Sequence, residues 1–299
     1  MASQFPLFSK LTLEDKNSIE KITSQFEPYS DFNFTSLFCW NLDGSTEISN
    51  LQGNLVIKLA DYLSGEIILS ILGDSSINES IHTIMGLKPK LDLIPKAVID
   101  RLKDKSQYKI VEDRDSFDYI YNTNELAGLS GQKFKKKRNK INKFNKSLAT
   151  RKLEIRVSRS PDRIELKPLY ELCQKWSKET SQQEGDFYSE RKAIRRLLSH
   201  FSELNLVLIE VVIDGQLVAF SANEIVNKDY AICHFEKALK TSGDNVYTYL
   251  ASESAKVIRN LGPQYINWEQ DLGLDGLRKS KLAYHPVGFL KKYSIFNKS

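Results

Sequence analysis

The stretch Tyr265–Pro286, which reads YINWEQDLGLDGLRKSKLAYHP, decides more about this chain of 299 residues than any other. It is predicted to form a strand, a tight glycine turn and a helix. Because alternate side chains of a strand share one face, Asn267, Glu269 and Asp271 are expected on the same side. The strand therefore presents two carboxylates and an amide in one direction.

The helix after the turn supplies cations. Arg278, Lys281 and His285 are spaced at i, i+3 and i+7, so they are expected along one helix face. Carboxylates, an amide and cations then meet at a strand-to-helix junction, where α/β proteins bind and process ligands. A functional site and a structural ion-pair network are the two readings of this cluster.

Composition places the chain among soluble globular proteins, because 41% of its residues are hydrophobic and 27% are charged. Its three cysteines lie far apart without a CxxC pair and its four histidines are scattered, so neither a disulfide framework nor a metal site is expected. The sequence shows no apolar run of membrane-helix length and no secretion signal. A cytoplasmic protein is expected, with peripheral contact to the inner face of the membrane as an alternative.

Strands and helices after residue 150 follow the order β-α-α-β-β-β-α-β-α-β. The Asp214-Gly215 pair between two apolar runs is a strong hairpin signal. This is the element order of the GNAT acyltransferase fold, with mixed α/β sheets. The first half has a vaguer order that fits a degenerate copy of the same unit. We expect a tandem GNAT-like fold with an N-terminal domain at 1–132, a connecting helix at 133–152 and a C-terminal domain with the active site at 153–299.

The connecting helix is strongly basic, because Lys133–Lys152 holds ten Lys or Arg residues and no acid. Phe134, Ile141 and Phe144 are spaced for one apolar stripe, which leaves a basic opposite face. Contact with the tRNA backbone, contact with an anionic membrane surface and a plain solvated helix are the three readings. The candidate nucleic-acid-binding residues are Lys133, Lys135, Lys136, Lys137, Arg138, Lys140 and Lys143.

Segments along nearly the whole chain resemble a largely uncharacterised bacterial family related to the C-terminal catalytic domain of phosphatidylglycerol lysyltransferases. They are Ser30–Phe38 with Trp40, Asp118–Tyr121, Leu126–Lys133, Lys137–Phe144, His234–Ala238, Ile266–Gly273, Gly276–Lys281 and Tyr284–Pro286. The resemblance implies the tandem GNAT architecture that Fem-type aminoacyltransferases also have. It further implies transfer of an aminoacyl group from charged tRNA to a lipid hydroxyl or a peptide amine.

The sequence departs from the lipid-modifying enzymes in having no membrane-spanning N-terminal region, which argues against a lipid acceptor. It also has no clear pyrophosphate loop of the GNAT type. The nearest segment, Lys240–Asn245, has a single glycine, and Asp244 opposes an anion there. Aminoacyl-tRNA is therefore expected as donor in preference to acetyl-CoA. No cofactor or metal is required, because the aminoacyl ester is already activated.

A second cluster of candidate residues lies in the predicted strand Tyr230–Lys237. His234 and Glu236 are expected on one face and Lys237 on the other. If this strand lies near residues 264–270, as in GNAT proteins, Glu236 approaches Glu269, and two nearby carboxylates raise the pKa of one of them, as a general base requires. The alternative is that a cation, Lys237 or Arg278, neutralises Glu236.

The candidate site residues fall into two groups. The catalytic candidates are Glu236 or Glu269 as base, with Asn267 and Tyr247 positioning the substrate, although Tyr247 is equally typical of a core aromatic. The substrate-binding candidates are Asp271, Arg278, Lys281, Lys237, His234, Asp31, Asn33 and Trp40, of which the last three are expected to line a cleft. An acetyl-CoA-dependent N-acetyltransferase and a non-catalytic protein that binds nucleic acid or anionic lipid are the alternative functions.

Overall fold

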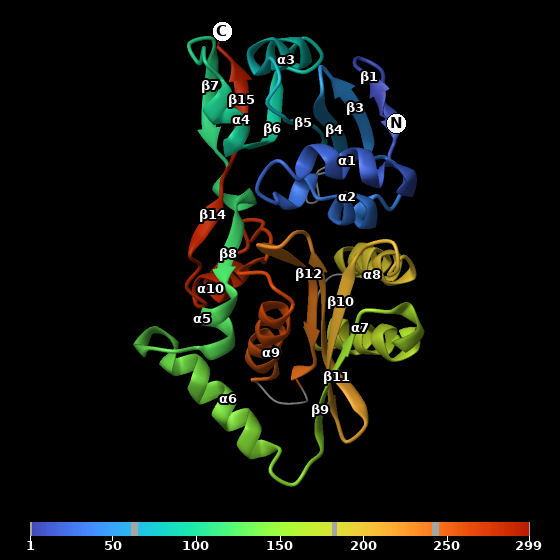
Figure 1. The fold of residues 1–299 in the computed structure, drawn as a ribbon, viewed down its shortest axis with the longest axis vertical. Coiled ribbons are helices and arrows are strands. Elements are labelled where there is room, and N and C mark those ends of the chain that lie inside the picture. Colours follow the sequence, from blue (N-terminus) through green and yellow to red (C-terminus); the bar gives the residue numbers. More distant parts are fainter. Residues whose placement is uncertain (1, 61–64, 181–183, 241–244, 299) are drawn as a thin grey trace. The chain divides into compact units, whose positions relative to one another are not determined.

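A computed structural model describes residues 2–60, 65–180, 184–240 and 245–298 (Figure 1). The chain forms two compact units. Unit 1 contains Met1–Tyr119, Gln270–Arg278 and Phe289–Ser299, and unit 2 contains Ile120–Glu269 and Lys279–Gly288. The predicted boundaries near residues 132 and 152 differ from these, because the chain passes between the units several times.

Unit 1 contains two sheets. The first has the order β1-β3-β4-β5 with β2 beside β3, and the second has the order β6-β15-β7. Their strands are β1 (Ser3–Gln4), β2 (Ser9–Lys10), β3 (Glu47–Leu51), β4 (Asn54–Ala60), β5 (Ile67–Leu72), β6 (Lys90–Pro95), β7 (Tyr108–Glu112) and β15 (Lys292–Asn297). The last strand of the chain thus lies between two strands from the first half.

Four α-helices belong to the described part of unit 1: α1 (Lys16–Thr23), α2 (Phe34–Trp40), α3 (Ile77–Met85) and α4 (Lys96–Arg101). Thr12 forms a capping box with Asp15, and one turn of 3-10 helix at Leu13–Asp15 precedes α1. Helix α3 buries Ile81 and Ile84 completely. The unit therefore has an apolar core of its own.

Unit 2 is built on a single large sheet. Its strand order is β14-β8-β13-β12-β11-β10-β9. The strands are β8 (Asp118–Asn122), β9 (Leu153–Ser158), β10 (Leu206–Ile213), β11 (Gln216–Ile225), β12 (Tyr230–Ala238), β13 (Tyr265–Asn267) and β14 (Gly288–Leu290). Asp214 and Gly215 both have positive φ, 50° and 80°, and form the predicted hairpin turn between β10 and β11.

Helices cover both faces of this sheet (Figure 1). They are α5 (Thr123–Gly128), α6 (Lys135–Ser147), α7 (Leu166–Thr180), α8 (Glu184–Ser199), α9 (Val246–Asn260) and α10 (Asp275–Leu282), of which the last begins in unit 1. Phe144 of α6 and Leu250 of α9 pack against Val207, Ile209 and Val211 of β10. The apolar stripe predicted for the basic helix is therefore part of the core of unit 2.

The element order predicted after residue 150 is confirmed, with one addition at the end. The final predicted strand is divided into β14 and β15, and β15 leaves the sheet of unit 2 for that of unit 1. Strand β8 from the first half occupies the place beside β13, where Ile120 pairs with Asn267. Asp244 and the rest of residues 241–244, in the segment compared above with a pyrophosphate loop, lie outside the described residues.

Candidate active site

Strand β12 is interrupted at the centre of the predicted site. Ala222 of β11 pairs with Phe235, but the next residue, Asn223, pairs with Cys233, so His234 is an extra residue in β12. Such bulges break the side-chain alternation and are common beside active sites. The alternation predicted from Cys233 to Lys237 is therefore broken at His234.

The bulged His234 is held between two carboxylates. Its Nε2 lies 3.0 Å from Oε2 of Glu224 and its Nδ1 lies 3.1 Å from Oε1 of Glu269. Burial lowers the pKa of His234, but the two carboxylates outweigh burial and raise it to about 9. The ring is thus an imidazolium that donates to both partners. We call these three residues the His234 clamp.

The clamp changes the interpretation of Glu269. Its backbone has a φ of 54° and its amide donates to Oδ1 of Asn267 at 2.6 Å, so the predicted strand ends at Asn267. Its carboxylate is held by the cation of the clamp, and the pKa of Glu236 is raised by burial and not by Glu269. Asn267 is completely buried and shapes this turn.

Glu236 has a different environment. Its side chain is half-buried, and no residue that the structure describes donates a hydrogen bond to its carboxylate. Burial raises the pKa of Glu236 to about 7, against the opposing charges of Lys237, Lys281 and Lys137. The shift has the predicted direction, but its cause is burial and not a second carboxylate. Glu236 can therefore exchange a proton near neutral pH.

Two of the lysines near Glu236 are occupied by internal partners. Lys281 donates to the carbonyl oxygens of Trp268 and Glu269 at 2.5 and 3.2 Å. Lys237 donates to Glu190 at 2.7 Å and lies 3.8 Å from the centre of the Trp176 ring. These contacts fix both cations beside the Glu236 carboxylate.

Two tyrosines also border Glu236. The hydroxyl oxygen of Tyr247 accepts from Nε1 of Trp176 at 2.5 Å, and burial raises the pKa of Tyr247. Burial likewise raises the pKa of Tyr284, and the negative charge of Glu236 adds to both shifts. Both hydroxyls therefore stay protonated. We call this group the Glu236 site, which consists of Lys137, Cys233, Glu236, Lys237, Tyr247, Lys281 and Tyr284.

Lys137 belongs to this site and not to the exposed basic face predicted for it. Its side chain is half-buried, and its Nζ lies 3.2 Å from the centre of the Tyr284 ring. Burial and Lys140 lower the pKa of Lys137 to about 8, while Glu236 opposes the shift. It makes no hydrogen bond to the residues that the structure describes.

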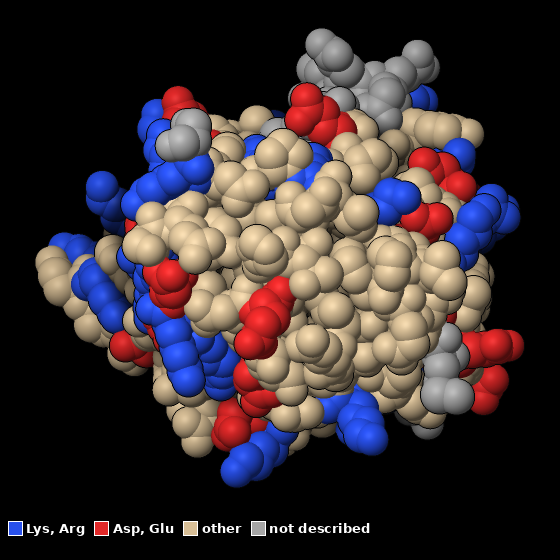
Figure 2. Space-filling model, turned by 90° about the horizontal axis from the view of Figure 1, so that it is seen from above, with Lys and Arg blue, Asp and Glu red and all other residues tan. Residues whose placement is uncertain are grey.

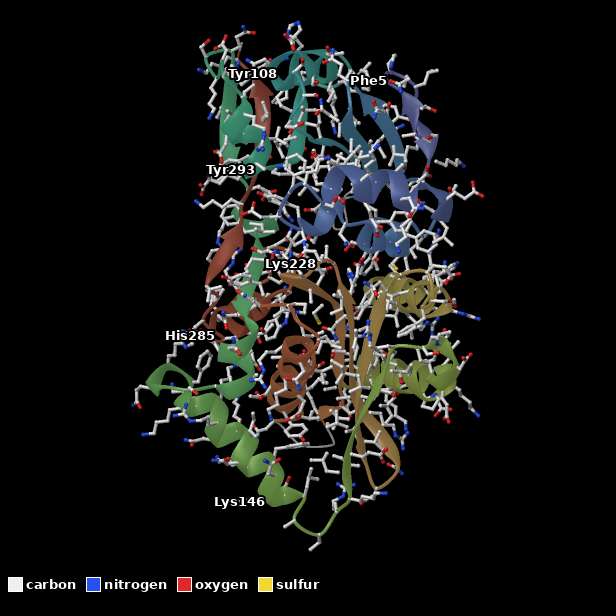
Figure 3. All side chains as sticks on the ribbon, viewed as in Figure 1. Phe5, Tyr108, Lys146, Lys228, His285 and Tyr293 are labelled. Carbon is white, nitrogen blue, oxygen red and sulfur yellow. The ribbon has the colours of Figure 1, made fainter. Side chains whose placement is uncertain are left out.

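The other predicted basic contacts divide into two kinds. Lys133 pairs with Glu125 at 2.6 Å, and Arg138 donates to the carbonyl oxygens of Leu129 and Gly131. The exposed cations of α6 are Lys135, Lys136, Lys140, Lys143 and Lys146. Lys146 lies near the last turn of α6, and His285 lies near its start (Figure 3).

Arg278 and Asp271 bind each other within unit 1. Nε and Nη2 of Arg278 donate to the two oxygens of the fully buried Asp271 at 2.9 and 2.7 Å, and Tyr119 donates at 2.5 Å. Burial raises the pKa of Asp271, but the Arg278 bonds outweigh it and lower the pKa to about 2. Arg278 and Asp271 thus form an ion pair, and both residues lie within unit 1.

The predicted helix face of three cations does not form. Helix α10 ends at Leu282, and the exposed His285 follows in a turn with a φ of 55°. Arg278 turns to Asp271 in unit 1, whereas Lys281 turns to the backbone of Trp268 in unit 2. The i, i+3, i+7 spacing of these three residues therefore did not predict a shared helix face.

The three candidates from the first half also lie within unit 1. Asp31 forms an ion pair with Lys292 and accepts from Gln270, and burial raises its pKa to about 6. Asn33 caps α2 by accepting from the Ser36 amide at 2.9 Å, and Trp40 is the last residue of α2. Asp31 and Asn33 thus serve the packing of unit 1.

Sequence reasoning missed several residues. Glu224 reaches the His234 clamp through strand pairing and stands in no recognisable pattern. Tyr284 reaches the Glu236 site through the turn after α10, and its segment was noted for the resemblance but not as part of a site. Lys292 is completely buried with Asp118, 2.8 Å away, although it follows another lysine in an ordinary strand. Only its surroundings in the folded unit mark it as special.

The C-terminal domain of phosphatidylglycerol lysyltransferases matches residues 24–296 of the chain. The chain belongs to this family. A conserved protein of unknown function from Bacteroides thetaiotaomicron VPI-5482 is 29% identical in structure-based comparison, with a TM-score of 0.82 over 97% of this chain and 99% of that one. The predicted fold class, mixed α/β of the tandem GNAT-like type, is confirmed.

Two further relatives extend this comparison. The structure of L-PGS from Bacillus licheniformis has a TM-score of 0.62 at 13% identity, over 97% of this chain and 93% of that one, and therefore shares the fold. An uncharacterized protein of Mycoplasmoides gallisepticum is 24% identical over 227 residues, which cover 73% of this chain and 70% of that protein. Family and fold together indicate an acyltransferase.

Among the described residues, no helix has the length and apolar character needed to cross a bilayer.

Proposed function

We propose that this protein transfers an aminoacyl group from charged tRNA to an amine or hydroxyl of a small molecule, peptide or lipid headgroup. The observation that carries the proposal is the Glu236 carboxylate. It is half-buried, makes no hydrogen bond to the described residues and has its pKa raised by burial to about 7. A general base works best when its pKa lies near the operating pH.

The reaction follows from this placement. Glu236 takes a proton from the attacking amine or hydroxyl, whose nitrogen or oxygen then bonds to the ester carbonyl carbon. The bond from that carbon to the ribose oxygen breaks, and the ribose oxygen takes up a proton. Lys281 and Lys237 are held beside Glu236 by their internal partners, so they supply fixed positive charge where negative charge develops.

The exposed cations of α6 support tRNA as the carrier. Lys136, Lys140 and Lys143 are exposed, and they are spaced at i, i+4 and i+7 along one side of the helix. On the face shown in Figure 2, by contrast, basic and acidic side chains are interspersed around a broad uncharged area. A run without acids suits a phosphate backbone, which binds through release of counterions.

The test compares the binding of charged tRNA, uncharged tRNA and acetyl-CoA at low and physiological salt, followed by single-turnover transfer from the donor that binds. We expect charged tRNA to bind and its aminoacyl group to move to an added amine or hydroxyl acceptor. Binding of acetyl-CoA alone would assign the protein to the acetyltransferases. Salt-sensitive binding of tRNA without transfer to any acceptor would make it a binding protein.

A further inference from the structure

Lys137 differs from every other lysine of α6 in the direction of its side chain. Lys135, Lys136, Lys140 and Lys143 are exposed, whereas Lys137 is half-buried with its Nζ 3.2 Å from the centre of the Tyr284 ring. Tyr284 is itself buried, with a 7% exposed side chain. The ring face attracts the ammonium group and holds it away from solvent.

Lys137 and Glu236 are also the two charged groups of the Glu236 site whose hydrogen-bonding capacity is unused. Lys281, Lys237 and Tyr247 each have a hydrogen bond to another described residue. Neither the Lys137 ammonium nor the Glu236 carboxylate has one, although each influences the titration of the other. Burying a charged group without a hydrogen-bonding partner costs free energy. Such a group is therefore a candidate for ligand binding or catalysis.

We infer that Lys137 is a second catalytic residue, which donates the proton to the leaving ribose oxygen while Glu236 accepts one from the attacking group. The inference rests on the proposed function. When the ester carbon–oxygen bond breaks, the ribose oxygen takes a proton from the Lys137 ammonium. Protonated Glu236 then releases its proton to solvent, and the neutral Lys137 amine takes up a proton from solvent. Both groups return to their starting states, and no other reactant is consumed.

The ionisation of the two groups fits this exchange. The pKa of Lys137 is lowered to about 8, so the group is charged at neutral pH, and the pKa of Glu236 is about 7. Release of a proton by Glu236 together with uptake of one by Lys137 is therefore downhill. The titratable groups around the pair are Lys140 on α6, Cys233 and Lys237 on β12, and Tyr247, Lys281 and Tyr284 on other elements.

The first test separates acid catalysis from tRNA contact. Lys137→Met and Lys137→Arg are compared with Lys140→Met, which removes an exposed lysine one turn away. The Lys137 variants are expected to slow single-turnover transfer about 10²-fold or more at saturating charged tRNA, with unchanged affinity. Arginine keeps the charge but cannot release its proton. If Lys137→Met instead weakens charged-tRNA binding as Lys140→Met does and leaves the rate of the bound donor unchanged, Lys137 is a tRNA contact.

The second test uses the leaving group. An aminoacyl ester of an acidic phenol needs no proton on its leaving oxygen, so the defect of Lys137→Met should largely disappear with this donor. The defect of Glu236→Gln should remain. An equal loss with both donors would overturn the acid role, because a merely structural effect of Lys137 does not depend on the leaving group.

The third measurement needs no turnover. Competitive labelling of lysines with acetic anhydride, followed across pH by mass spectrometry, reports the titration of each amine. Lys137 should titrate near 8 and lower still in Glu236→Gln, because Glu236 opposes its shift. If Lys137 titrates at about 10.4, like an ordinary lysine, it does not interact with Glu236 as proposed. If the wild-type protein transfers no acyl group, the proposed function fails and the acid role fails with it, and the labelling result still decides whether the pair exists.

Discussion

Glu236 of unit 2 and Asp271 of unit 1 are both carboxylates removed from bulk water, but their surroundings shift their pKa values in opposite directions. Asp271 receives two hydrogen bonds from Arg278 and one from Tyr119, and its pKa falls to about 2. Glu236 receives none from the described residues, and its pKa rises to about 7. A carboxylate with satisfied oxygens is part of the structure, whereas an unsatisfied one is available for chemistry.

The largest expected effect comes from Glu236→Gln, which removes the base without changing the shape of the side chain. Single-turnover transfer should fall by a factor of about 10²–10⁴. In the wild type the rate should rise as pH rises through about 7, because Glu236 must be deprotonated to accept a proton. The variant should lose this limb of the pH profile.

Glu171→Gln, which changes an exposed carboxylate on α7, serves as the control and should leave the rate unchanged. If Glu236→Gln turns over like the wild type, the contrast between the two carboxylates has no catalytic meaning.

Asp271→Asn tests the other half of the comparison. The substitution removes the charge that holds Arg278, so the free energy of unfolding should fall by about 1.5–3 kcal/mol, the range for hydrogen bonds to charged groups. Urea denaturation would measure this loss. Asp275→Asn, an exposed neighbour in α10, should change stability by less than about 0.5 kcal/mol. A similar small effect for both variants would show that the Asp271 network contributes nothing to folding.

The His234 clamp lies between these extremes, because its groups are buried yet fully paired. The folded-state pKa of His234, about 9, is above the ordinary value of 6.5. The charged His234 therefore contributes its full stabilisation of the folded state below pH 6.5, and this contribution is lost as the pH rises to about 9. We expect the wild type to lose about 3 kcal/mol of unfolding free energy over this window.

Chemical denaturation at several pH values would detect the loss, and His234→Gln should remove it. His82→Gln, at an exposed histidine, should keep it. An unchanged pH dependence in His234→Gln would show that the imidazole is not charged in the folded protein.

The smallest effects are expected on the exposed side of α6. Lys140→Met should weaken tRNA binding by less than tenfold and lower the slope of log affinity against log salt by about 1. Lys105→Met removes an exposed lysine from unit 1 and should change neither quantity. Equal slopes for all three proteins would exclude Lys140 from the tRNA contact.

Local patterns in the sequence predicted a large part of the fold. The Asp214-Gly215 turn, the apolar stripe with Phe144 and the neighbouring strands β12 and β13 are all where the patterns place them. These features depend on residues close in sequence or on a helix period, so the chain itself reveals them. Glu236 was also found in this way, because an acid in an apolar strand is conspicuous.

Other features depend on contacts between distant segments. The extra residue at His234 is visible only in the register between β11 and β12, and the partner of Arg278 only in the path of the turn after Asn267. Spacing alone placed Arg278 and Lys281 together, although they serve different units. The physical reason is that a left-handed backbone at Glu269 and Leu272 ends the regular alternation.

The sequence by itself determined the order of the elements, because this order follows from local periodicity and turn residues, and it indicated the family through the segments that resemble it. It also predicted Glu236 as a candidate base. Only the tertiary structure decided which charges are free. Lys137 stands in a uniform run of lysines, and nothing in that run distinguishes it from Lys136 or Lys140. Its side chain is turned inward because Tyr284, 147 residues further along the chain, presents a ring face to it. Burial and pairing are properties of the folded surroundings, and they set the pKa of each group.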